Sequence, residues 1–453
     1  MKEMLVILFL LVSSLAGAAQ PEAESAGREM TLPRAVDYAL EHSPDMKGAS
    51  AEIKRRQGVS KTARAGLLPQ VDVFGDLSHW RLDHVYPPGA PPQVMRFDDT
   101  VYTAGAELKL LVWDFGKTAS ELDAARERIS VAQASFDRRS QELIFDVASL
   151  YLKTLTYSDL IDAAQSARKS LDVLLKQTRE LVDAGRAVRS DALKVSTRLA
   201  QVESDIAALE AGRLTSLSSL AAAMGLEGEL PRLAYILPEN APNPTSYGSE
   251  AELIDEAMAK RADLLSQVHE VKAASSQERA ARLSRWPKSE FRASAYEYGS
   301  NSPGAVGSVN EAPANGVGDW SVGVRITFPL FDAGLRSGQI QSAAAQHEIA
   351  RAAKEKLKLQ IEREVRTALA ELGSAKARAM AMQESVSQAE EALRDERLKF
   401  ESGRSAINFV LDAEAALLTS RSQLRQAQRS VTTASLLLEL SLGRIQSTAV
   451  SRP

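Results

Sequence analysis

Strict alternation of apolar and polar residues marks two short stretches of the chain. The stretch YTAGAELKLLVW, which begins at Tyr102, and the stretch WSVGVRITF, which begins at Trp320, each place apolar or small residues at every second position. A period of two is typical of a strand with one buried face. Weaker alternation precedes each stretch, around 71–77 and 291–296. The pattern therefore predicts two β-hairpins, over 69–113 and 287–329.

A different period follows each hairpin. After Lys117, apolar and small residues recur at steps of three and four, and no proline occurs before Gly185. Such steps predict a coiled-coil helix, about 100 Å long at ~1.5 Å per residue. Helices of roughly half that length are expected before each hairpin, over 32–68 and 250–285, and after Gly185 and Gly403. Two half-length helices placed end to end would match one long helix, which predicts a rod with the strands at one end.

The chain is an internal tandem duplication. Gly116 and Gly334 occupy the same motif, and 334 − 116 = 218. Other pairs keep the same offset over many helix-breaking positions, and a chance match between helices would not. The predicted organisation is a first repeat over 19–230, a proline-rich linker over 231–249, a second repeat over 250–448 and a tail over 449–453. Pairs that keep the offset include Asp114 with Asp332, Gly185 with Gly403, Leu193 with Leu411, and Gly225 with Gly443.

The N-terminus and the composition restrict the class of protein. Residues 1–18 combine an apolar run with a small-residue cleavage site, as in a secretory signal peptide, and no later segment offers ~18 consecutive apolar residues. The sequence has no cysteine and a net charge of -4. The first property excludes disulfides and thiolate metal sites, and the second argues against a nucleic-acid partner. If the chain spans a membrane, it does so with strands.

The hairpins leave two interpretations open. One apolar face, one polar face and aromatic residues near the strand ends (Tyr102, Trp113, Trp320 and Phe328) suit barrel strands in lipid. Soluble hairpins that pack on the helices would give the same alternation. Four strands cannot close a barrel, because about eight are needed, and open sheet edges are not tolerated in lipid. A membrane location therefore requires several chains that share one barrel.

Several stretches, in the right order and in both repeats, resemble the TolC-like outer-membrane efflux proteins of Gram-negative bacteria. They are AVDYALEHSPDMKGASAEI, ITFPLFDAGLRSGQIQSAAAQHEIA, LVDAGRAVRSDALKVSTRL and KFESGRSAINFVLDAEAAL. The resemblance implies an α+β membrane protein: an antiparallel α-helical coiled-coil barrel plus a transmembrane β-barrel shared by a homotrimer, with four strands per chain and 12 in total. It also implies outer-membrane lipid, a periplasmic adaptor protein and an inner-membrane RND or ABC transporter as partners.

The resemblance directs attention to the end of the rod opposite the strands. There it implies helical turns that contact the adaptor, at Gly185, Arg186, Ser190, Gly403, Arg404 and Asn408. It implies carboxylates at the periplasmic pore mouth, at Asp191 and Asp412; Phe409 stands where some relatives carry another acid. Ordinary solvated helix surface is the alternative for all these polar residues. The lipidated N-terminal cysteine of many relatives is absent.

The strand-to-helix junctions are expected to be architectural. Asp114 and Asp332 are good helix-capping residues, Gly116 and Gly334 permit a tight turn, and Pro329 terminates a strand. No metal, cofactor or nucleophile motif is found, and no phosphate-binding loop, so an enzyme is not expected. The predicted function is a passive outer-membrane exit channel of a tripartite efflux or type I secretion system, with a long periplasmic extension. A periplasmic coiled-coil structural or adaptor protein without a pore is the alternative, and the cargo (drugs, metals or secreted protein) is left open.

Overall fold

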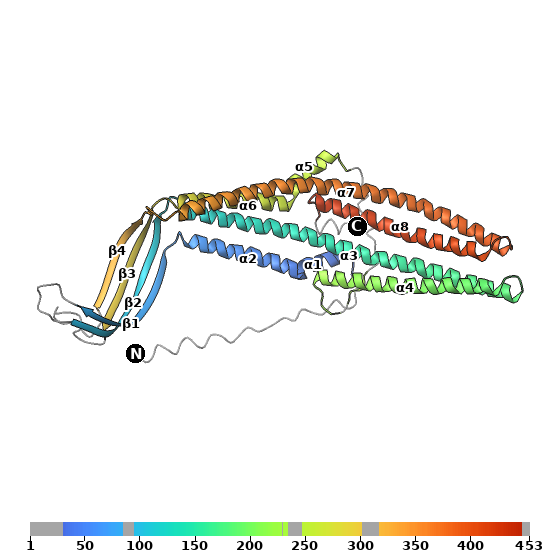
Figure 1. Ribbon diagram of the computed structural model, residues 1–453, viewed down its shortest axis with the longest axis horizontal. Helices are drawn as coiled ribbons and strands as arrows, with labels where there is room; N and C mark the ends of the chain where they lie inside the picture. Colours follow the sequence, from blue (N-terminus) through green and yellow to red (C-terminus); the bar gives the residue numbers. More distant parts are fainter. Residues whose placement is uncertain (1–29, 85–94, 229, 234–246, 301–316, 446–453) are drawn as a thin grey trace.

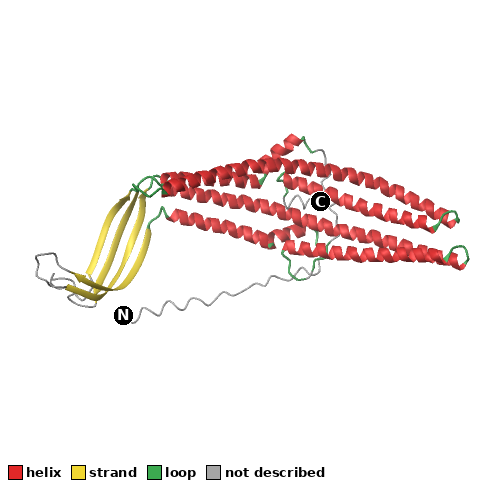
Figure 2. Ribbon diagram, viewed as in Figure 1, coloured by secondary structure: helices red, strands yellow, loops and turns green. Residues whose placement is uncertain are grey.

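The protein is a long helical rod with a small sheet at one end (Figures 1 and 2). The computed structural model describes residues 30–84, 95–228, 230–233, 247–300 and 317–445. The predicted signal peptide, the tail and most of the linker lie outside these residues. The described elements are α1 (Leu32–His42), α2 (Pro44–Ala65), β1 (Gln70–His84), β2 (Met95–Trp113), α3 (Lys117–Asp183), α4 (Arg189–Met224), α5 (Glu250–Lys260), α6 (Ala262–Leu283), β3 (Lys288–Ser300), β4 (Val317–Thr327), α7 (Leu335–Glu401) and α8 (Ile407–Ser441).

The four strands form one antiparallel sheet in the order β1-β2-β3-β4. Val71 lies opposite Leu108, Leu108 opposite Ala293, and Ala293 opposite Val322. Because side chains alternate between the faces of a sheet, this register gathers the alternating apolar residues of all four strands on one face. That face is exposed in the single chain, with Val73 85% and Trp320 74% accessible. Within the described strands, β1 and β4 form the two open edges of the sheet.

The long helices α3 and α7 run the length of the rod. Each has 67 residues, and their first residues, Lys117 and Leu335, are 218 positions apart. Beside the sheet, the helices lie in the order α2, α3, α6, α7; in the far half the order is α4, α3, α8, α7. The helices thus form a single layer, and α7 is an edge along its whole length.

The half-length helices before the hairpins differ from the sequence prediction. We expected one helix over 32–68 and one over 250–285, but each is broken. In the first repeat, Ser43 leaves the helical conformation and its side chain accepts a hydrogen bond from the backbone N–H of Asp45. Pro44 then starts α2, a position where its missing N–H costs nothing. In the second repeat the break is at Arg261, which has extended backbone angles.

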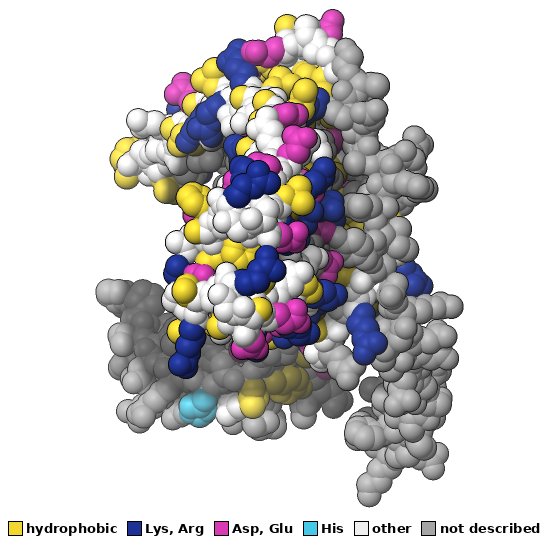
Figure 3. Space-filling view, turned by 90° about the vertical axis from the view of Figure 1, so that its right-hand side faces the viewer, with side chains coloured by type: hydrophobic (Ala, Val, Ile, Leu, Met, Phe, Trp, Pro, Cys, Tyr) yellow, Lys and Arg dark blue, Asp and Glu magenta, His cyan; other side chains and the backbone are white. Residues whose placement is uncertain are grey.

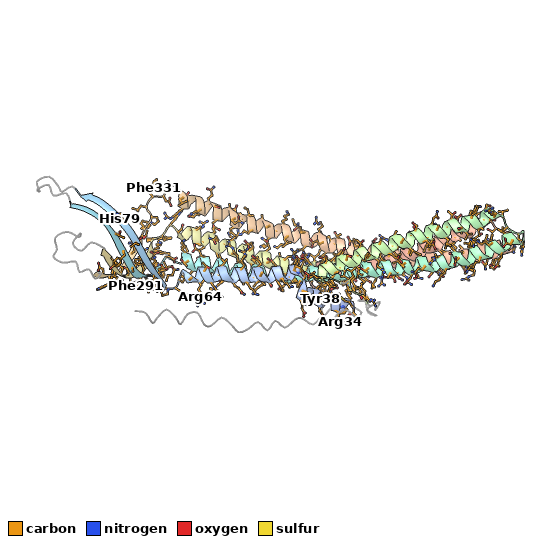
Figure 4. All side chains as sticks on the ribbon, turned by 90° about the horizontal axis from the view of Figure 1, so that it is seen from below. Arg34, Tyr38, Arg64, His79, Phe291 and Phe331 are labelled. Atoms are coloured by element: carbon orange, nitrogen blue, oxygen red, sulfur yellow. The ribbon has the colours of Figure 1, made fainter. Side chains whose placement is uncertain are left out.

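The returning helices end against these breaks. A methyl group added at Gly225, just after α4, would come within 2.9 Å of the carbonyl oxygen of His42. One added at Gly443, just after α8, would come within 3.2 Å of the backbone of Arg261. The half-length helices therefore meet end to end at mid-rod, near α1, where Figure 4 labels Arg34 and Tyr38.

Apolar side chains between the helices hold the layer together. One buried cluster surrounds Tyr151 and Met224 at mid-rod, a second lines the far half around Leu171 and Val410, and a third packs α5 and α8 on α7 around Ile361. Among the described helices, none is both long enough and apolar enough to cross a membrane.

Candidate functional site: the helical turns and the strand-to-helix junctions

Two helical turns form the end of the rod opposite the sheet. Each long helix ends in a glycine with a left-handed backbone, Gly185 at φ 65° and Gly403 at φ 73°. The next N–H bonds back to a carbonyl of the last helical turn, from Arg186 to Leu181 and from Arg404 to Lys399, both at 2.8 Å. This is the usual glycine-terminated helix end. A methyl group at either glycine would meet no atom within 4 Å, so the backbone angle is what requires glycine.

The polar residues predicted for adaptor contact all lie on this end surface. Arg186, Ser190, Arg404 and Asn408 are exposed. Figure 3 looks at this end of the molecule: basic and acidic side chains are interspersed there, with hydrophobic side chains between them. Phe409 is among the hydrophobic residues that are exposed beside the second turn. The surface thus offers both charges and apolar area, without an excess of one sign.

The two predicted pore-mouth carboxylates lie close to the turns but are not equivalent. Asp191 is in the first turn of α4 and forms an ion pair with Lys194, with a distance of 3.7 Å. Asp412 lies in the second turn of α8, is exposed, and has no ion pair within the described part of the chain. At the 218-residue offset Asp191 corresponds to Phe409, and Asp412 corresponds to Lys194. Each return helix therefore contributes one carboxylate, at different levels.

The second turn carries a side-chain network that the first turn lacks. Glu396 accepts hydrogen bonds from Lys399 at 2.9 Å and from Ser405 at 2.8 Å, so α7 is tied to the segment beyond Gly403. The contact with Lys399, followed by that with Ser405, lowers the pKa of Glu396. The equivalent residues of the first repeat are Thr178, Leu181 and Ala187, which cannot form these bonds. Sequence reasoning missed this difference.

Buried polar contacts join the two helical hairpins in the far half of the rod. Glu414 of α8 accepts hydrogen bonds from Arg397 of α7 and, at 2.7 Å, from Ser170 of α3. Nearer mid-rod, Arg429 of α8 forms a buried ion pair with Asp159 of α3 at 2.9 Å. Sequence reasoning missed both contacts. The sequence did contain a signal for the contact of Glu414. This residue lies three or four positions from Val410 and Leu417, on the same helix face as Ile407, and the structure buries all of them.

At the other end, each strand-to-helix junction is closed by an aspartate. Asp114 accepts hydrogen bonds from the N–H groups of Gly116 at 3.0 Å and Thr118 at 2.7 Å. Asp332 does the same for Gly334 at 3.1 Å and Arg336 at 3.2 Å. These are the bonds that a helix-capping carboxylate makes.

The chain changes direction sharply within each junction. Phe115 and Ala333, which precede the two glycines, also have positive φ angles, of 58° and 51°. Pro329 follows the end of β4 by two residues. The second junction thus repeats the first in backbone geometry as well as in sequence. Among the described residues, no group of three or more His, Asp or Glu side chains is arranged to hold a metal ion.

Comparison with known proteins identifies the family. A family model described as "Outer membrane efflux protein" matches residues 35–226 and 253–444. The chain belongs to the outer membrane efflux protein family. The sequence is 24% identical to the solvent efflux pump outer membrane protein SrpC of Pseudomonas putida, over 94% of this chain and 87% of SrpC. It is 23% identical to the proteases secretion protein PrtF of Dickeya chrysanthemi, over 94% of this chain and 89% of PrtF.

Solved structures share the fold. The outer membrane channel CmeC of Campylobacter jejuni superposes with a TM-score of 0.77 at 14% sequence identity, over 92% of this chain and 88% of CmeC. The resemblance to TolC-like channels is therefore confirmed, and family membership places the protein in the outer membrane. The two matched segments begin 218 residues apart and end 218 residues apart, which is the offset between the repeats. The first segment covers most of α1 to α4, and the second covers most of α5 to α8.

Proposed function

We propose that three copies of this chain form a passive duct that carries cargo across the periplasm and the outer membrane. The main support for the proposal is that the strands and helices form a single layer with two unpaired edges. One edge of the layer is formed by β4 and α7, and the other by β1, α2 and α4. Such a layer closes only by joining its two edges, and a head-to-tail contact repeated around an axis gives a ring.

The edge helix α7 carries unpartnered apolar residues suited to such a contact. Five large apolar residues of α7 are exposed. Of the four sequence intervals between successive ones, two are whole numbers of seven-residue heptads, and the other two are whole numbers of heptads plus three or four residues. This is the spacing of a coiled-coil seam, on the side away from the buried residues of the same helix. The exposed residues are Leu335, Ile349, Leu359, Met380 and Leu398.

The opposite edge offers apolar residues at matching heights. Leu193 and Leu214 of α4 are exposed, as are Leu398 and Met380 of α7. Counted from the turn end of each helix, Leu193 matches Leu398, and Leu214 matches Met380. At ~1.5 Å per residue, the members of each pair differ in height by no more than about 6 Å. Edge-to-edge contact between copies would cover all four side chains.

In this arrangement the sheets would form the part of the duct within the membrane. The apolar face, with Val73 and Trp320, would contact lipid, and the polar face, with Asp72 and Ser294, would line the pore. Three copies would supply 12 strands, more than the roughly eight that closure needs. The number three rests on the resemblance to TolC-like channels, and the exposed apolar face supports the lipid contact.

The turn end would then face the cell interior. We infer that Gly185, Gly403 and the exposed polar residues beside them contact a periplasmic adaptor, that Asp191 and Asp412 line the pore mouth, and that an RND or ABC transporter in the inner membrane supplies the energy. The duct itself performs no chemical reaction. The names of the relatives SrpC and PrtF span solvent efflux and protease secretion, so either class of cargo is compatible with the fold.

Cysteine cross-linking tests the assembly directly, because the chain has no cysteine of its own. In the Leu193→Cys/Leu398→Cys variant, a short bifunctional thiol reagent should produce covalent dimers and trimers in outer-membrane preparations, and nothing larger. The matched controls are the two single-cysteine variants, which should give no ladder. Monomer alone, or a ladder that continues beyond three chains, would refute the trimer.

Planar-bilayer recording tests the duct. The purified protein should give discrete conductance steps. If it extracts from cells without detergent and never conducts, the pore-free periplasmic scaffold is the better description.

A further inference from the structure

The sheet meets the helices at an elbow of the molecule (Figures 1 and 2). A cavity of about 560 Å³ lies there. Its lining comes from the polar face of the sheet, from the first turns of α3 and α7, and from the segments that end α2 and α6. We call it the elbow cavity. Its volume is in the range of small-molecule sites, which is roughly 300–1,000 Å³.

Basic side chains outnumber acidic ones in the lining, and three of them also form ion pairs with carboxylates outside it: Lys109 with Asp72 and Glu107, Lys117 with Glu121, and Arg336 with Asp332. Five basic side chains contribute to the lining, against the two carboxylates of Asp114 and Glu290. Asp114 already accepts hydrogen bonds from the backbone at the start of α3, so it is engaged in capping that helix. Glu290 is shared by two cations, Lys288 and Arg292, each at 2.9 Å. The five basic residues are Lys109, Lys117, Lys288, Arg292 and Arg336.

One of the cations retains an unused donor. The Nη2 of Arg292 donates to Glu290, but its Nε is buried and has no hydrogen-bond partner within the described part of the structure. A guanidinium offers donors in a planar fork that suits carboxylate, sulfonate and phosphate oxygens. An anionic group in the cavity would give this buried N–H a partner, which is favourable because a buried unpaired donor is costly.

The other lining residues are neutral polar or apolar, and the apolar ones include Trp286, Leu68 and Leu111. The Trp286 indole stacks on the ring of Phe115 with the ring centroids 5.1 Å apart. We propose that the elbow cavity binds organic anions that carry a carboxylate, sulfonate or phosphate on an apolar ring system. The acidic group would contact Arg292, Lys109 and Lys288, and the ring would lie against Trp286.

The position of the cavity gives the site a role in transport, and this step rests on the proposed function. The polar face of the sheet would line the pore, so cargo that leaves the helical tunnel would meet the elbow before it enters the barrel. Rings of like charge favour ions of the opposite sign in a pore. Organic anions would therefore be enriched at the point where the tunnel ends.

The binding test uses two ions that share a naphthalene ring and carry opposite charges. The full-length protein in a non-ionic detergent is titrated by calorimetry with naphthalene-1-sulfonate and with 1-naphthylmethylammonium. We expect saturable binding of the sulfonate at one site per chain, and no saturable binding of the ammonium ion. Arg292→Gln should weaken sulfonate binding at least ten-fold, and Arg292→Lys should retain part of the affinity. Equal binding of both ions, or unchanged affinity in Arg292→Gln, would overturn the proposal.

Arg325 provides a matched control. It lies on the same face of the sheet, on β4, but does not line the cavity. Arg325→Gln removes the same charge and should leave sulfonate affinity within about two-fold. A loss equal to that of Arg292→Gln would reduce the effect to general electrostatics and refute a defined site.

Two further measurements distinguish this site from a lipid-binding site and from the duct itself. Phosphatidylglycerol could satisfy the same cationic residues, so the sulfonate titration is repeated in nanodiscs with and without this lipid. If the lipid abolishes sulfonate binding, the site belongs to a lipid headgroup and the cargo proposal fails. In planar bilayers, conductance without sulfonate binding would refute only the site, and sulfonate binding without conductance would refute only the duct.

Discussion

The buried ion pair between Asp159 and Arg429 gives the sharpest test of how the two helical hairpins are held together. The Nε and Nη2 atoms of Arg429 donate to Oδ2 of Asp159 at 3.1 and 2.9 Å. The side chains of Asp159 and Arg429 are 5% and 10% exposed, respectively. Because one residue is on α3 and the other on α8, the pair crosses the boundary between the two repeats.

Arg429→Met removes the charge and keeps most of the apolar stem. Asp159 is then left as a buried carboxylate without its cation, which costs about 3–5 kcal/mol. Replacing both residues, as Asp159→Leu with Arg429→Met, leaves no buried charge. Such replacements are typically neutral or stabilising, by about 1–4 kcal/mol. The double variant should therefore be more stable than the single one.

Hydrogen–deuterium exchange of peptides from α3 and α8 measures the effect locally, because exchange reports the free energy of local opening. A loss of about 3 kcal/mol corresponds to roughly 150-fold faster exchange, at about 1.36 kcal/mol per ten-fold change. We expect this acceleration in Arg429→Met and its absence in the double variant. Unchanged exchange in the single variant would mean that Asp159 is not held by the pair. Equal acceleration in both variants would mean that packing, and not charge, is responsible.

Three other predictions concern single positions. Gly105→Ala places a methyl group 2.5 Å from the side chain of Tyr296 on β3. At the equivalent position of β4, the methyl group of Gly323→Ala meets no atom within 4 Å. Only Gly105→Ala should therefore lower the yield of folded protein in the outer membrane. Gly403→Ala forces a left-handed conformation, with φ 73°, on a residue with a side chain, and should cost about 1–2 kcal/mol in denaturant titrations followed by circular dichroism. Arg444 and, to a lesser extent, Lys260 hold the pKa of Glu256 at about 2, below its ordinary value. The stabilisation is therefore present above pH ~5 and is lost as the pH falls towards 2; after solvent screening it is worth about 1 kcal/mol. Arg444→Gln should reduce this acid dependence, and Lys260, at 2.8 Å from Glu256, should retain the rest.

The sequence predicted much of the fold because the decisive signals are local. Alternation over Tyr102–Leu110 determines which side chains share a face, and the strand register then brings equivalent faces together. The constant offset between the repeats similarly predicts two long helices of equal length. Neither inference depends on which helices and strands are in contact. The break at Ser43 also had a local signal, because Pro44 follows a good helix-capping residue, although we had expected the helix to continue.

Other features depend on contacts between distant residues, which periodicity does not encode. The break at Arg261 occurs without proline or glycine; its guanidinium is buried and bonds to Asp263, Glu364 and the carbonyl of Ser441. The elbow cavity likewise gathers residues from segments far apart in the chain, from Gly66 to Gln339. Such sites appear only when the order of elements in the layer is known.

The duplicated turns show how the two repeats have diverged without losing their geometry. Gly185 and Gly403 have the same backbone conformation, and the residue after each glycine donates the same hydrogen bond to the last helical turn. The first turn adds one backbone bond, from the N–H of Ala187 to the carbonyl of Leu181 at 3.1 Å. Only the second turn is tied across by Glu396, Lys399 and Ser405. The first turn depends on its backbone alone, so it should open at a lower free energy than the second. If one of the two turns rearranges when a partner binds, we expect it to be the first turn, which has no such side-chain bonds to break.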